Sequence, residues 1–219
     1  MKNPKFLIAI LLCAFGYLVA SCSTTPKPEI YPTLTPRPLP GWLLKFIKNP
    51  TCSPPCWENI VPGETTLEQA KLLLARQPDV QDSYVEDTIP FGKTLLWLNG
   101  SAPVDDENIV QMVWLRTSFY GVLLDQIVNR YGDPKYVVFS YWYENRVSVD
   151  LLYPDIGLVI STRQYEKGHE PDNVMADISP KDEVADILFL APGLEYYYAK
   201  MIWGLPLMQY DWKGYQTYP

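Results

Sequence analysis

The sequence predicts an α+β fold built from two tandem units, each consisting of a helix followed by an antiparallel sheet. Three observations lead to this prediction. Helical periodicity occurs twice, each helical segment ends at a glycine or proline signal, and each is followed by segments in which apolar and polar residues alternate. We expect one globular domain over residues 41–219, with units at about 57–116 and 117–190 and an aromatic C-terminal extension at 191–219.

The first unit begins with a clear helix signal. Thr65 is expected to be the N-cap, because Glu68 follows three residues later and completes a capping box. Pro78 ends the helix, and strands are expected at 94–99 and 109–115, joined by a polar loop. One helical face carries the apolar residues Leu67, Ala70, Leu73 and Leu74.

The second unit repeats this order. A helix is expected over 120–131, and the Gly132-Asp133-Pro134 sequence ends it. Its inward side is predicted to carry Leu123, Leu124, Ile127 and Val128. The alternation that follows predicts a sheet with one covered face, with strands at 135–143, 146–153, 157–163 and 184–190.

The two helices also share a short sequence. Leu67-Glu68-Gln69-Ala70 matches Leu124-Asp125-Gln126-Ile127, and each stands about ten residues before a proline. Together with the repeated order of elements, this favours a tandem duplication of one unit. The duplication requires Ala70 and Ile127 to occupy equivalent inward positions.

The first 21 residues have the three parts of a secretory signal peptide. A basic start with Lys2 and Lys5 precedes an apolar run of 14 residues, 6–19, and the small residues Ala20 and Ser21 follow. A permanent transmembrane anchor is the weaker interpretation, because a spanning helix needs about 20 apolar residues.

Cys22 is the expected attachment point for lipid. The Val19-Ala20-Ser21-Cys22 sequence resembles the lipobox of bacterial lipoproteins, in which the cysteine carries diacylglycerol and fatty acyl chains such as palmitate. The resemblance implies an extracytoplasmic protein on the outer face of the plasma membrane, or at the outer membrane of a cell with two membranes. Two or more acyl chains give a stable anchor where a single chain does not. The alternative is ordinary cleavage, with Cys22 as a spare thiol.

The next residues, 22–40, are expected to be a tether. Six prolines between Pro26 and Pro40 remove backbone donors and favour an extended chain. Gly41 to Lys48 then forms a short amphipathic segment, which either lies on the membrane interface or, as we favour, docks on the domain.

Charge argues against polyanionic partners. The chain has a formal net charge of −7, and loss of residues 1–21 leaves 16 basic against 25 acidic residues. Nucleic-acid binding depends on lysine and arginine neutralising phosphates, and the chain has no polybasic cluster. No cofactor or metal is expected.

Resemblances to known families point to binding. Residues 61–70, Val-Pro-Gly-Glu-Thr-Thr-Leu-Glu-Gln-Ala, look like the helix start of the SmpA/OmlA-type envelope lipoproteins, and the doubled unit looks like the tandem-repeat beta-lactamase inhibitory proteins. These families pack helices on an antiparallel sheet and bind other proteins. The stretch from Pro55-Cys56-Trp57 to Thr66 is similar to uncharacterised lipoproteins of Chloroflexota-like bacteria.

Cys52 and Cys56 are expected to form a structural disulfide. Three residues, two of them prolines, separate these cysteines, so they do not form the C-x-x-C redox motif, and export favours oxidation. A redox-active pair is the competing interpretation.

Other candidate sites have simpler explanations. His169 lies in a hydrophilic Gly/Pro loop without a recognisable catalytic partner, and 105–108 (Asp-Asp-Glu-Asn) suits a solvated hairpin tip better than a calcium loop. Asn99-Gly100-Ser101 suits a turn better than a glycosylation site. Carboxylates such as Asp82, Glu86 and Asp87 could pair as in a glycosidase, but an acidic protein exposes many carboxylates.

Two function classes stay open. The favoured one is a non-enzymatic module that binds an envelope or extracellular protein, and the other is a surface hydrolase or carbohydrate-binding protein. The discriminating feature is a cleft with two or more convergent acidic or nucleophilic side chains. The aromatic residues that could form a binding face are Tyr141, Trp142, Tyr143, Tyr196, Tyr197, Tyr198 and Trp203.

Overall fold

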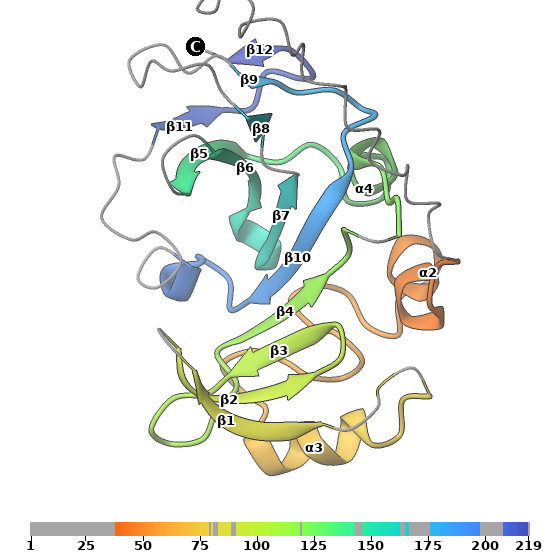
Figure 1. Ribbon diagram of the computed structural model, residues 1–219, viewed down its shortest axis with the longest axis vertical. Helices are drawn as coiled ribbons and strands as arrows, with labels where there is room; N and C mark the ends of the chain where they lie inside the picture. The colour runs from red at the N-terminus through yellow and green to blue at the C-terminus, as the bar shows by residue number, and fades with distance from the viewer. Residues whose placement is uncertain are drawn as a thin grey trace, which may run out of the picture. The chain divides into compact units, whose positions relative to one another are not determined.

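The computed structural model describes residues 38–78, 80, 83–88, 91–118, 120–142, 146–162, 165–166, 176–197 and 208–218, all within one compact unit, 36–219. The side chains of 140–142, 146–147, 165–166, 176 and 208 are not described. Figure 1 shows the helices α2 (Gly41–Lys48), α3 (Leu67–Leu74) and α4 (Leu124–Tyr131) with a large antiparallel sheet. The structure confirms the α+β class, and strands make up most of the regular structure.

The main sheet contains ten strands among the described residues, all paired antiparallel. Their order is β1-β2-β3-β4-β10-β7-β6-β5-β11, and β8 pairs with β6. The strands of this path are β1 (Tyr84–Thr88), β2 (Gly92–Trp97), β3 (Gly100–Pro103), β4 (Met112–Arg116), β5 (Tyr136–Trp142), β6 (Arg146–Tyr153), β7 (Leu158–Thr162), β10 (Val184–Leu190) and β11 (Met208–Asp211). The remaining strands are β8 (Tyr165–Glu166) and the separate pair β9 (Ala176–Asp177) and β12 (Thr217–Tyr218).

The α3 helix begins one residue later than the capping pattern predicted. Thr66, not Thr65, is the N-cap: its hydroxyl accepts a hydrogen bond from the Gln69 backbone N–H (3.3 Å), and the Gln69 side chain accepts one from the Thr66 backbone N–H (3.0 Å). The Thr65 hydroxyl instead accepts a hydrogen bond from the backbone N–H of Val61 at 2.8 Å. Thr65 therefore closes the turn that precedes the helix.

The α4 helix is shorter than the predicted segment 120–131. Its first residue is Leu124, because the chain before it is extended: Leu123 forms a β-bridge with Glu183, and the Val122 carbonyl accepts a hydrogen bond from Val184 at 2.8 Å. Gly132, with a φ of 83°, ends the helix as predicted.

The α2 helix docks on the domain. Its Trp42, Leu43 and Phe46 side chains are buried, and the Phe46 carbonyl accepts a hydrogen bond from the Tyr131 hydroxyl of α4 at 2.7 Å. Its basic side is exposed, where Lys45 lies 3.7 Å from Glu58. The docked orientation therefore agrees with the favoured expectation for this segment.

The two faces of the sheet carry different clusters. Residues such as Leu95, Leu115 and Ile187 share one hydrophobic cluster with residues of all three helices, and this side is called the helix face. The other side, called the opposite face, buries a smaller cluster that includes Leu152 and Leu188. Strand alternation produces this division, because successive side chains point to opposite sides.

Among the described residues, no helix is long and apolar enough to cross a membrane.

Candidate functional site

The opposite face is hollowed over strands β1 to β4. In β2, Leu95 points to the helix face and Leu96 to the opposite face. In β4, Leu115 points to the helix face and Trp114 to the opposite face. The hollow between these strands has a volume of about 310 Å³. No helix covers it in the part of the chain that the structure describes (Figure 1).

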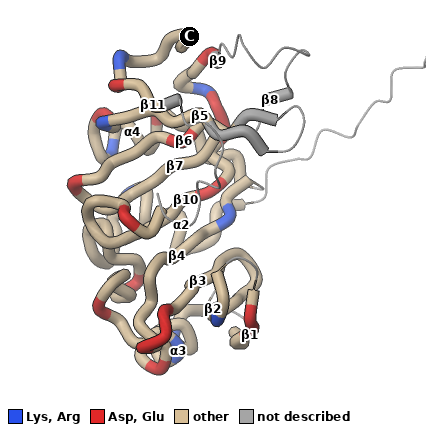
Figure 2. Tube along the Cα trace, turned by 90° about the vertical axis from the view of Figure 1, so that its left-hand side faces the viewer, with Lys and Arg blue, Asp and Glu red and all other residues tan. Residues whose placement is uncertain are grey.

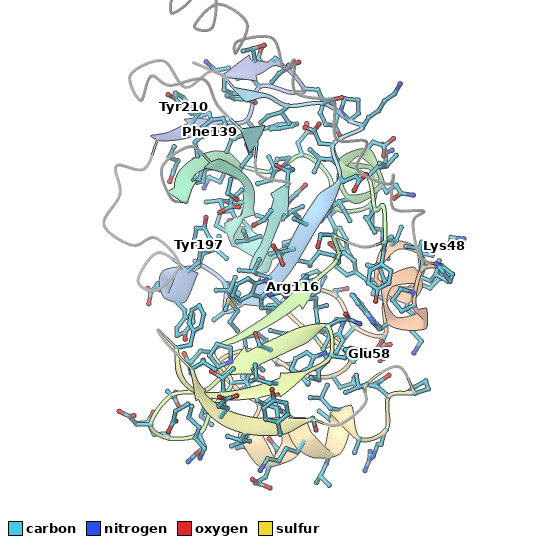
Figure 3. The ribbon with its side chains drawn as sticks, in the orientation of Figure 1. Lys48, Glu58, Arg116, Phe139, Tyr197 and Tyr210 are labelled. Carbon is cyan, nitrogen blue, oxygen red and sulfur yellow. A yellow bond between two sulfur atoms is a disulfide. The ribbon has the colours of Figure 1, made fainter. Side chains whose placement is uncertain are left out.

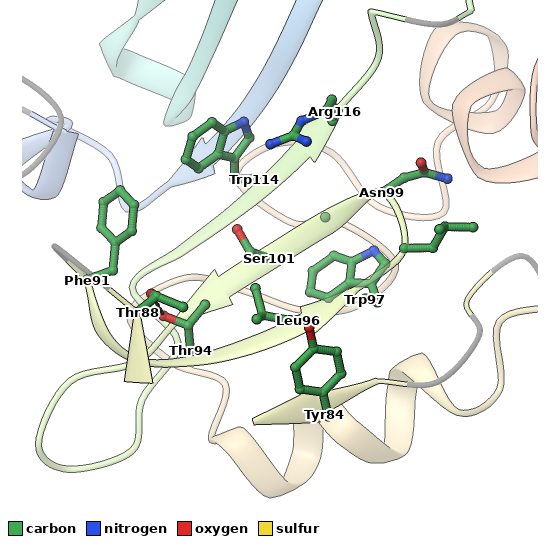
Figure 4. A pocket seen from close by; sticks show the side chains of 12 residues that line it. Tyr84, Thr88, Phe91, Thr94, Leu96, Trp97, Asn99, Ser101, Trp114 and Arg116 are labelled. Carbon is green, nitrogen blue, oxygen red and sulfur yellow. Dashed lines mark hydrogen bonds between the residues drawn. The ribbon is translucent and has the colours of Figure 1, made fainter. Parts of the chain in front are cut away.

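Aromatic and aliphatic side chains form much of the lining of this hollow (Figure 4). Phe91 and Trp114 meet edge to face with ring centroids 6.1 Å apart. Two rim residues, Tyr84 and Leu98, are 56% and 74% exposed, so this apolar surface is accessible. Exposed apolar surface gathered around a concavity is typical of interaction sites.

Trp97 joins the hollow to the core. Its indole stacks on Trp57 with ring centroids 5.7 Å apart and an interplanar angle of 9°. The ring passes over Gly100, where an added Cβ would lie 2.4 Å from it, so only glycine leaves room for this position. The turn at Asn99 before Gly100 is a hairpin connection, as the sequence predicted.

The polar lining of the hollow carries a single charge among its described residues, the guanidinium of Arg116. Asn99, Ser101, Thr88 and Thr94 supply neutral hydrogen-bonding groups, and the two threonine hydroxyls lie 2.7 Å apart. The charged residues of the described chain are otherwise scattered, with basic residues well separated (Figure 2).

Asp186 supports Trp114 from the neighbouring strand. The Trp114 indole N–H donates a hydrogen bond to the Asp186 carboxylate at 2.8 Å, and Asp186 pairs with Arg116 in the β10–β4 register. Burial raises the pKa of Asp186, while the Trp114 hydrogen bond and the Arg116 charge lower it. This contact fixes the indole at the floor of the hollow.

A second carboxylate, Asp150 of β6, lies on the opposite face beyond β7. It accepts hydrogen bonds from the hydroxyls of Ser161 (2.5 Å), Tyr197 (2.5 Å) and Ser148 (3.1 Å). Burial raises the pKa of Asp150, and the three hydroxyl donors lower it. Through Tyr197, this carboxylate holds the segment that follows β10 against the sheet (Figure 3).

The predicted aromatic residues whose side chains are described pack with the opposite-face cluster instead of forming an exposed binding face. Tyr197 is 1% exposed and belongs to the opposite-face cluster, and Tyr196 packs at the edge of that cluster. Tyr141 and Trp142 belong to β5, but their side chains are not described. The other predicted positions lie outside the described residues, namely Cys22, Tyr143, His169, Tyr198 and Trp203, as does Asp82.

The residues of the hollow itself were not identified from sequence. The alternation in the predicted strand 109–115 places Trp114 opposite Val113 and Leu115, which is the signal that could have pointed to it. Tyr84 and Phe91 gave no such signal, because neither β1 nor the turn that follows it at Phe91 was predicted.

Cys52 and Cys56 form the predicted disulfide, with Cα atoms 5.7 Å apart. Trp57 follows directly, and its buried ring carries the stacked Trp97. The disulfide therefore fixes the chain path beneath one wall of the hollow.

The acidic hairpin tip has a structural role. The Asp105 carboxylate accepts hydrogen bonds from the Ile109 backbone N–H at 2.8 Å and the Gln111 side chain at 2.6 Å. Nowhere in the described part of the chain do three or more His, Cys, Asp or Glu side chains gather as metal ligands would.

No protein-family model matches the chain, and comparisons with curated proteins and with solved structures find no match either.

Proposed function

We propose that the protein is a non-enzymatic interaction module of the cell envelope, which binds a protein partner through the hollow on the opposite face. The main supporting observation is the uncovered hollow over β1 to β4, which Tyr84, Phe91 and Trp114 line together with one cationic side chain, Arg116. Aromatic residues and arginine are enriched where protein interfaces concentrate their binding energy. The described lining residues include no carboxylate and no thiol, which supports binding over hydrolysis.

The proposal places the domain outside the cytoplasm on a lipid anchor. The signal-peptide pattern, the lipobox-like sequence ending at Cys22 and the proline-rich residues 22–40 support this location. The Cys52–Cys56 disulfide is consistent with an oxidising compartment.

A surface hydrolase or carbohydrate-binding protein is the second candidate, and two carboxylates on one face give it some support. Asp150 and Asp186 flank Ser161 in the strand registers. Asp150 is buried beneath Tyr197, and Asp186 accepts the hydrogen bond from Trp114, so each carboxylate has a structural partner. This arrangement favours the binding proposal.

We further infer that the globular part is a tandem duplication of one helix-plus-sheet unit. Ala70 and Ile127 are both fully buried, as the shared sequence requires. The same side-chain bond starts both helices, in which Gln69 and Gln126 each accept from the N-cap backbone N–H at 3.0 Å. Two backbone hydrogen bonds between the start of each helix and the chain that leads into the last strand of its unit also match. The donors and acceptors are Leu67 to Asn108 and Val110 to Thr65 in the first unit, and Leu124 to Asp182 and Val184 to Val122 in the second.

The strand registers support the same inference. The last strands of the two units, β4 and β10, pair antiparallel, with Trp114 opposite Leu188 at the centre of the pairing. A two-fold rotation about this central pair places Arg116 on Leu190 and Asp186 on Met112. Following the registers outward gives matching positions on successive strands: Ser101 and Val159, Leu96 and Leu152, Leu95 and Leu151, Thr94 and Asp150, Tyr84 and Tyr136, Val85 and Val137.

Site-specific photo-crosslinking in intact cells tests the binding proposal. Leu98→benzoylphenylalanine places the probe at the rim of the hollow, and Leu72→benzoylphenylalanine is the matched control on α3. We expect a discrete protein adduct, identified by mass spectrometry, from position 98 only, and its loss when Tyr84→Ala is added. Equal adducts from both positions, or adducts composed of polysaccharide, would contradict the proposal.

A further inference from the structure

The second unit fills its own opposite face with the segment that follows β10. Leu194 and Tyr197 are 0% and 1% exposed and pack in one cluster with Val138, Leu152 and Leu188. The Tyr197 hydroxyl reaches Asp150, and Glu195, between the two buried residues, is exposed. Residues 194–197, Leu-Glu-Tyr-Tyr, thus place an apolar and an aromatic side chain on the sheet.

The hollow occupies the corresponding place in the first unit. Six of its lining residues correspond in register to positions around Leu194 and Tyr197: Tyr84 to Tyr136, Thr94 to Asp150, Leu96 to Leu152, Ser101 to Val159, Trp114 to Leu188 and Arg116 to Leu190. Both sites therefore present a tyrosine, a leucine and a large apolar residue at matching positions.

The chain after β4 takes a different path and leaves the hollow open. The Thr117 backbone N–H donates to the Ala185 carbonyl at 2.7 Å, and the Thr117 hydroxyl donates to the Val184 carbonyl at 2.8 Å. These bonds direct the segment toward α4. The cluster that contains Leu194 and Tyr197 reaches the first unit at Met112, Phe91 and Trp114, and the described part of the chain places no second such pair over the hollow.

One difference between the sites concerns charge. Arg116 stands at the position of Leu190, and it is the one charged group among the described lining residues of a chain that is acidic overall. Arg116 lies opposite Asp186 in the β10–β4 register, and its guanidinium has further N–H donors that favour an occupant carrying a carboxylate.

We propose that the hollow binds a partner-protein segment in which an acidic residue lies between apolar and aromatic side chains, the chemistry of this chain's own residues 194–197. The proposal rests on the protein-binding function above and specifies the occupant. The aromatic side chain enters between Tyr84 and Trp114, and the carboxylate pairs with Arg116. A second copy of the chain is a poor occupant, because its own Leu194 and Tyr197 are already buried.

A synthetic peptide tests this directly. The probe is residues 191–197, Ala-Pro-Gly-Leu-Glu-Tyr-Tyr, with blocked termini so that the glutamate is its only charge. It is titrated into the full chain in detergent, with the indole N–H signals of the tryptophans followed by NMR. We expect a saturable shift of the Trp114 signal.

Matched variants assign the contacts. In the peptide, Tyr197→Ala should weaken binding about tenfold, because an aromatic ring is left out of the hollow. Glu195→Gln in the peptide and Arg116→Gln in the protein should each weaken binding about threefold. Combining these two changes should add nothing to either one, because they remove the same pair. Tyr84→Ala should remove the shift, which separates the hollow from competition for the chain's own site in the second unit.

Three outcomes would overturn the inference: no shift at millimolar peptide, equal binding of all peptide variants, or additive effects of Glu195→Gln and Arg116→Gln. A saturable shift with an oligosaccharide in place of the peptide would assign the hollow to carbohydrate. The crosslinking result at position 98 keeps the two proposals distinct. A protein adduct there without peptide binding would leave the proposed function standing and refute only the occupant.

Discussion

The bond between Tyr197 and Asp150 allows a quantitative test of how the C-terminal segment is held. Tyr197→Phe keeps the buried ring but removes the hydroxyl that donates to the Asp150 carboxylate at 2.5 Å. Both residues are buried, so water does not replace the lost donor. Above the raised pKa of Asp150, where its carboxylate is ionised, a hydrogen bond to this charged group contributes about 1.5–3 kcal/mol, so we expect a loss of about 2 kcal/mol in the free energy of unfolding there.

Thermal and urea unfolding measure this loss. For a domain of this size, 2 kcal/mol corresponds to a fall in Tm of about 4–8 °C. Tyr84→Phe is the matched control, because Tyr84 is 56% exposed and its substitution should change stability by less than about 0.5 kcal/mol. If Tyr197→Phe is no more destabilising than Tyr84→Phe, the hydrogen bond does not hold the segment.

The same contact predicts a pH dependence. Burial raises the pKa of Asp150 above its ordinary value of 3.8, so the folded protein keeps this proton to higher pH than the unfolded chain does. The stability contributed by the protonated group is fully present below about pH 3.8 and is lost as the pH rises through the raised pKa.

Two variants should therefore respond to pH in opposite directions. Asp150→Asn should gain stability relative to the native protein as the pH rises through this window, because the amide does not ionise. The deficit of Tyr197→Phe should grow over the same window, because the lost donor stabilised the ionised carboxylate. Urea midpoints from pH 4 to pH 8 measure both trends, and a deficit that shrinks with rising pH would contradict this account.

Three further changes have defined outcomes. Cys22→Ala should release the protein from the membrane fraction and block normal processing, and retention of a mature-length variant at high salt would contradict lipid anchoring. Gly100→Ala should displace Trp97 from Trp57 and cost about 1–3 kcal/mol with a change in tryptophan fluorescence, whereas Ser101→Ala should leave the fluorescence unchanged. Replacing both Cys52 and Cys56 by Ala should cost about 2 kcal/mol in urea unfolding, the entropy of a five-residue loop, and an unchanged midpoint would refute a stabilising role.

Periodicity identified the elements that are buried on one side. The predicted strands at 94–99, 135–143, 146–153, 157–163 and 184–190 correspond to β2, β5, β6, β7 and β10, because their apolar residues alternate or run continuously. The strands β1 and β3 were not predicted, for two different reasons. Most of β1 is exposed at the sheet edge, and β3 is the short Gly-Ser-Ala-Pro sequence, which has little apolar character.

The N-cap of α3 shows a limit of local patterns. Thr65 with Glu68 and Thr66 with Gln69 both fit the capping box, so the pattern alone does not distinguish them. Tertiary contacts decide the outcome, because the Thr65 carbonyl accepts a hydrogen bond from Val110, 45 positions later in the chain (110 − 65). Thr65 therefore belongs to the extended segment that precedes the helix.

The hollow could not be predicted for a related reason. Tyr84 and Trp114 approach each other only through the registers of three successive strand pairs, β1–β2, β2–β3 and β3–β4. The adjacent tyrosines at 196–198 suggest a binding face because they form a continuous aromatic run in the sequence. Asp150, which binds Tyr197 inside the protein, is distant in sequence and resembles any other acidic residue.

The difference between the two opposite faces comes from a few side chains at corresponding positions. At the position of Asp150, which anchors Tyr197, the first unit has Thr94, whose hydroxyl is paired with that of Thr88. At the position of Leu190, it has Arg116, whose charge is poorly suited to burial under an apolar cover. A unit without this internal acceptor and with a cation at this position would not hold a cover from its own chain. These two differences leave the aromatic side chains of the hollow uncovered, with the Arg116 guanidinium beside Asp186, and an external segment with a carboxylate and an aromatic ring would complement them.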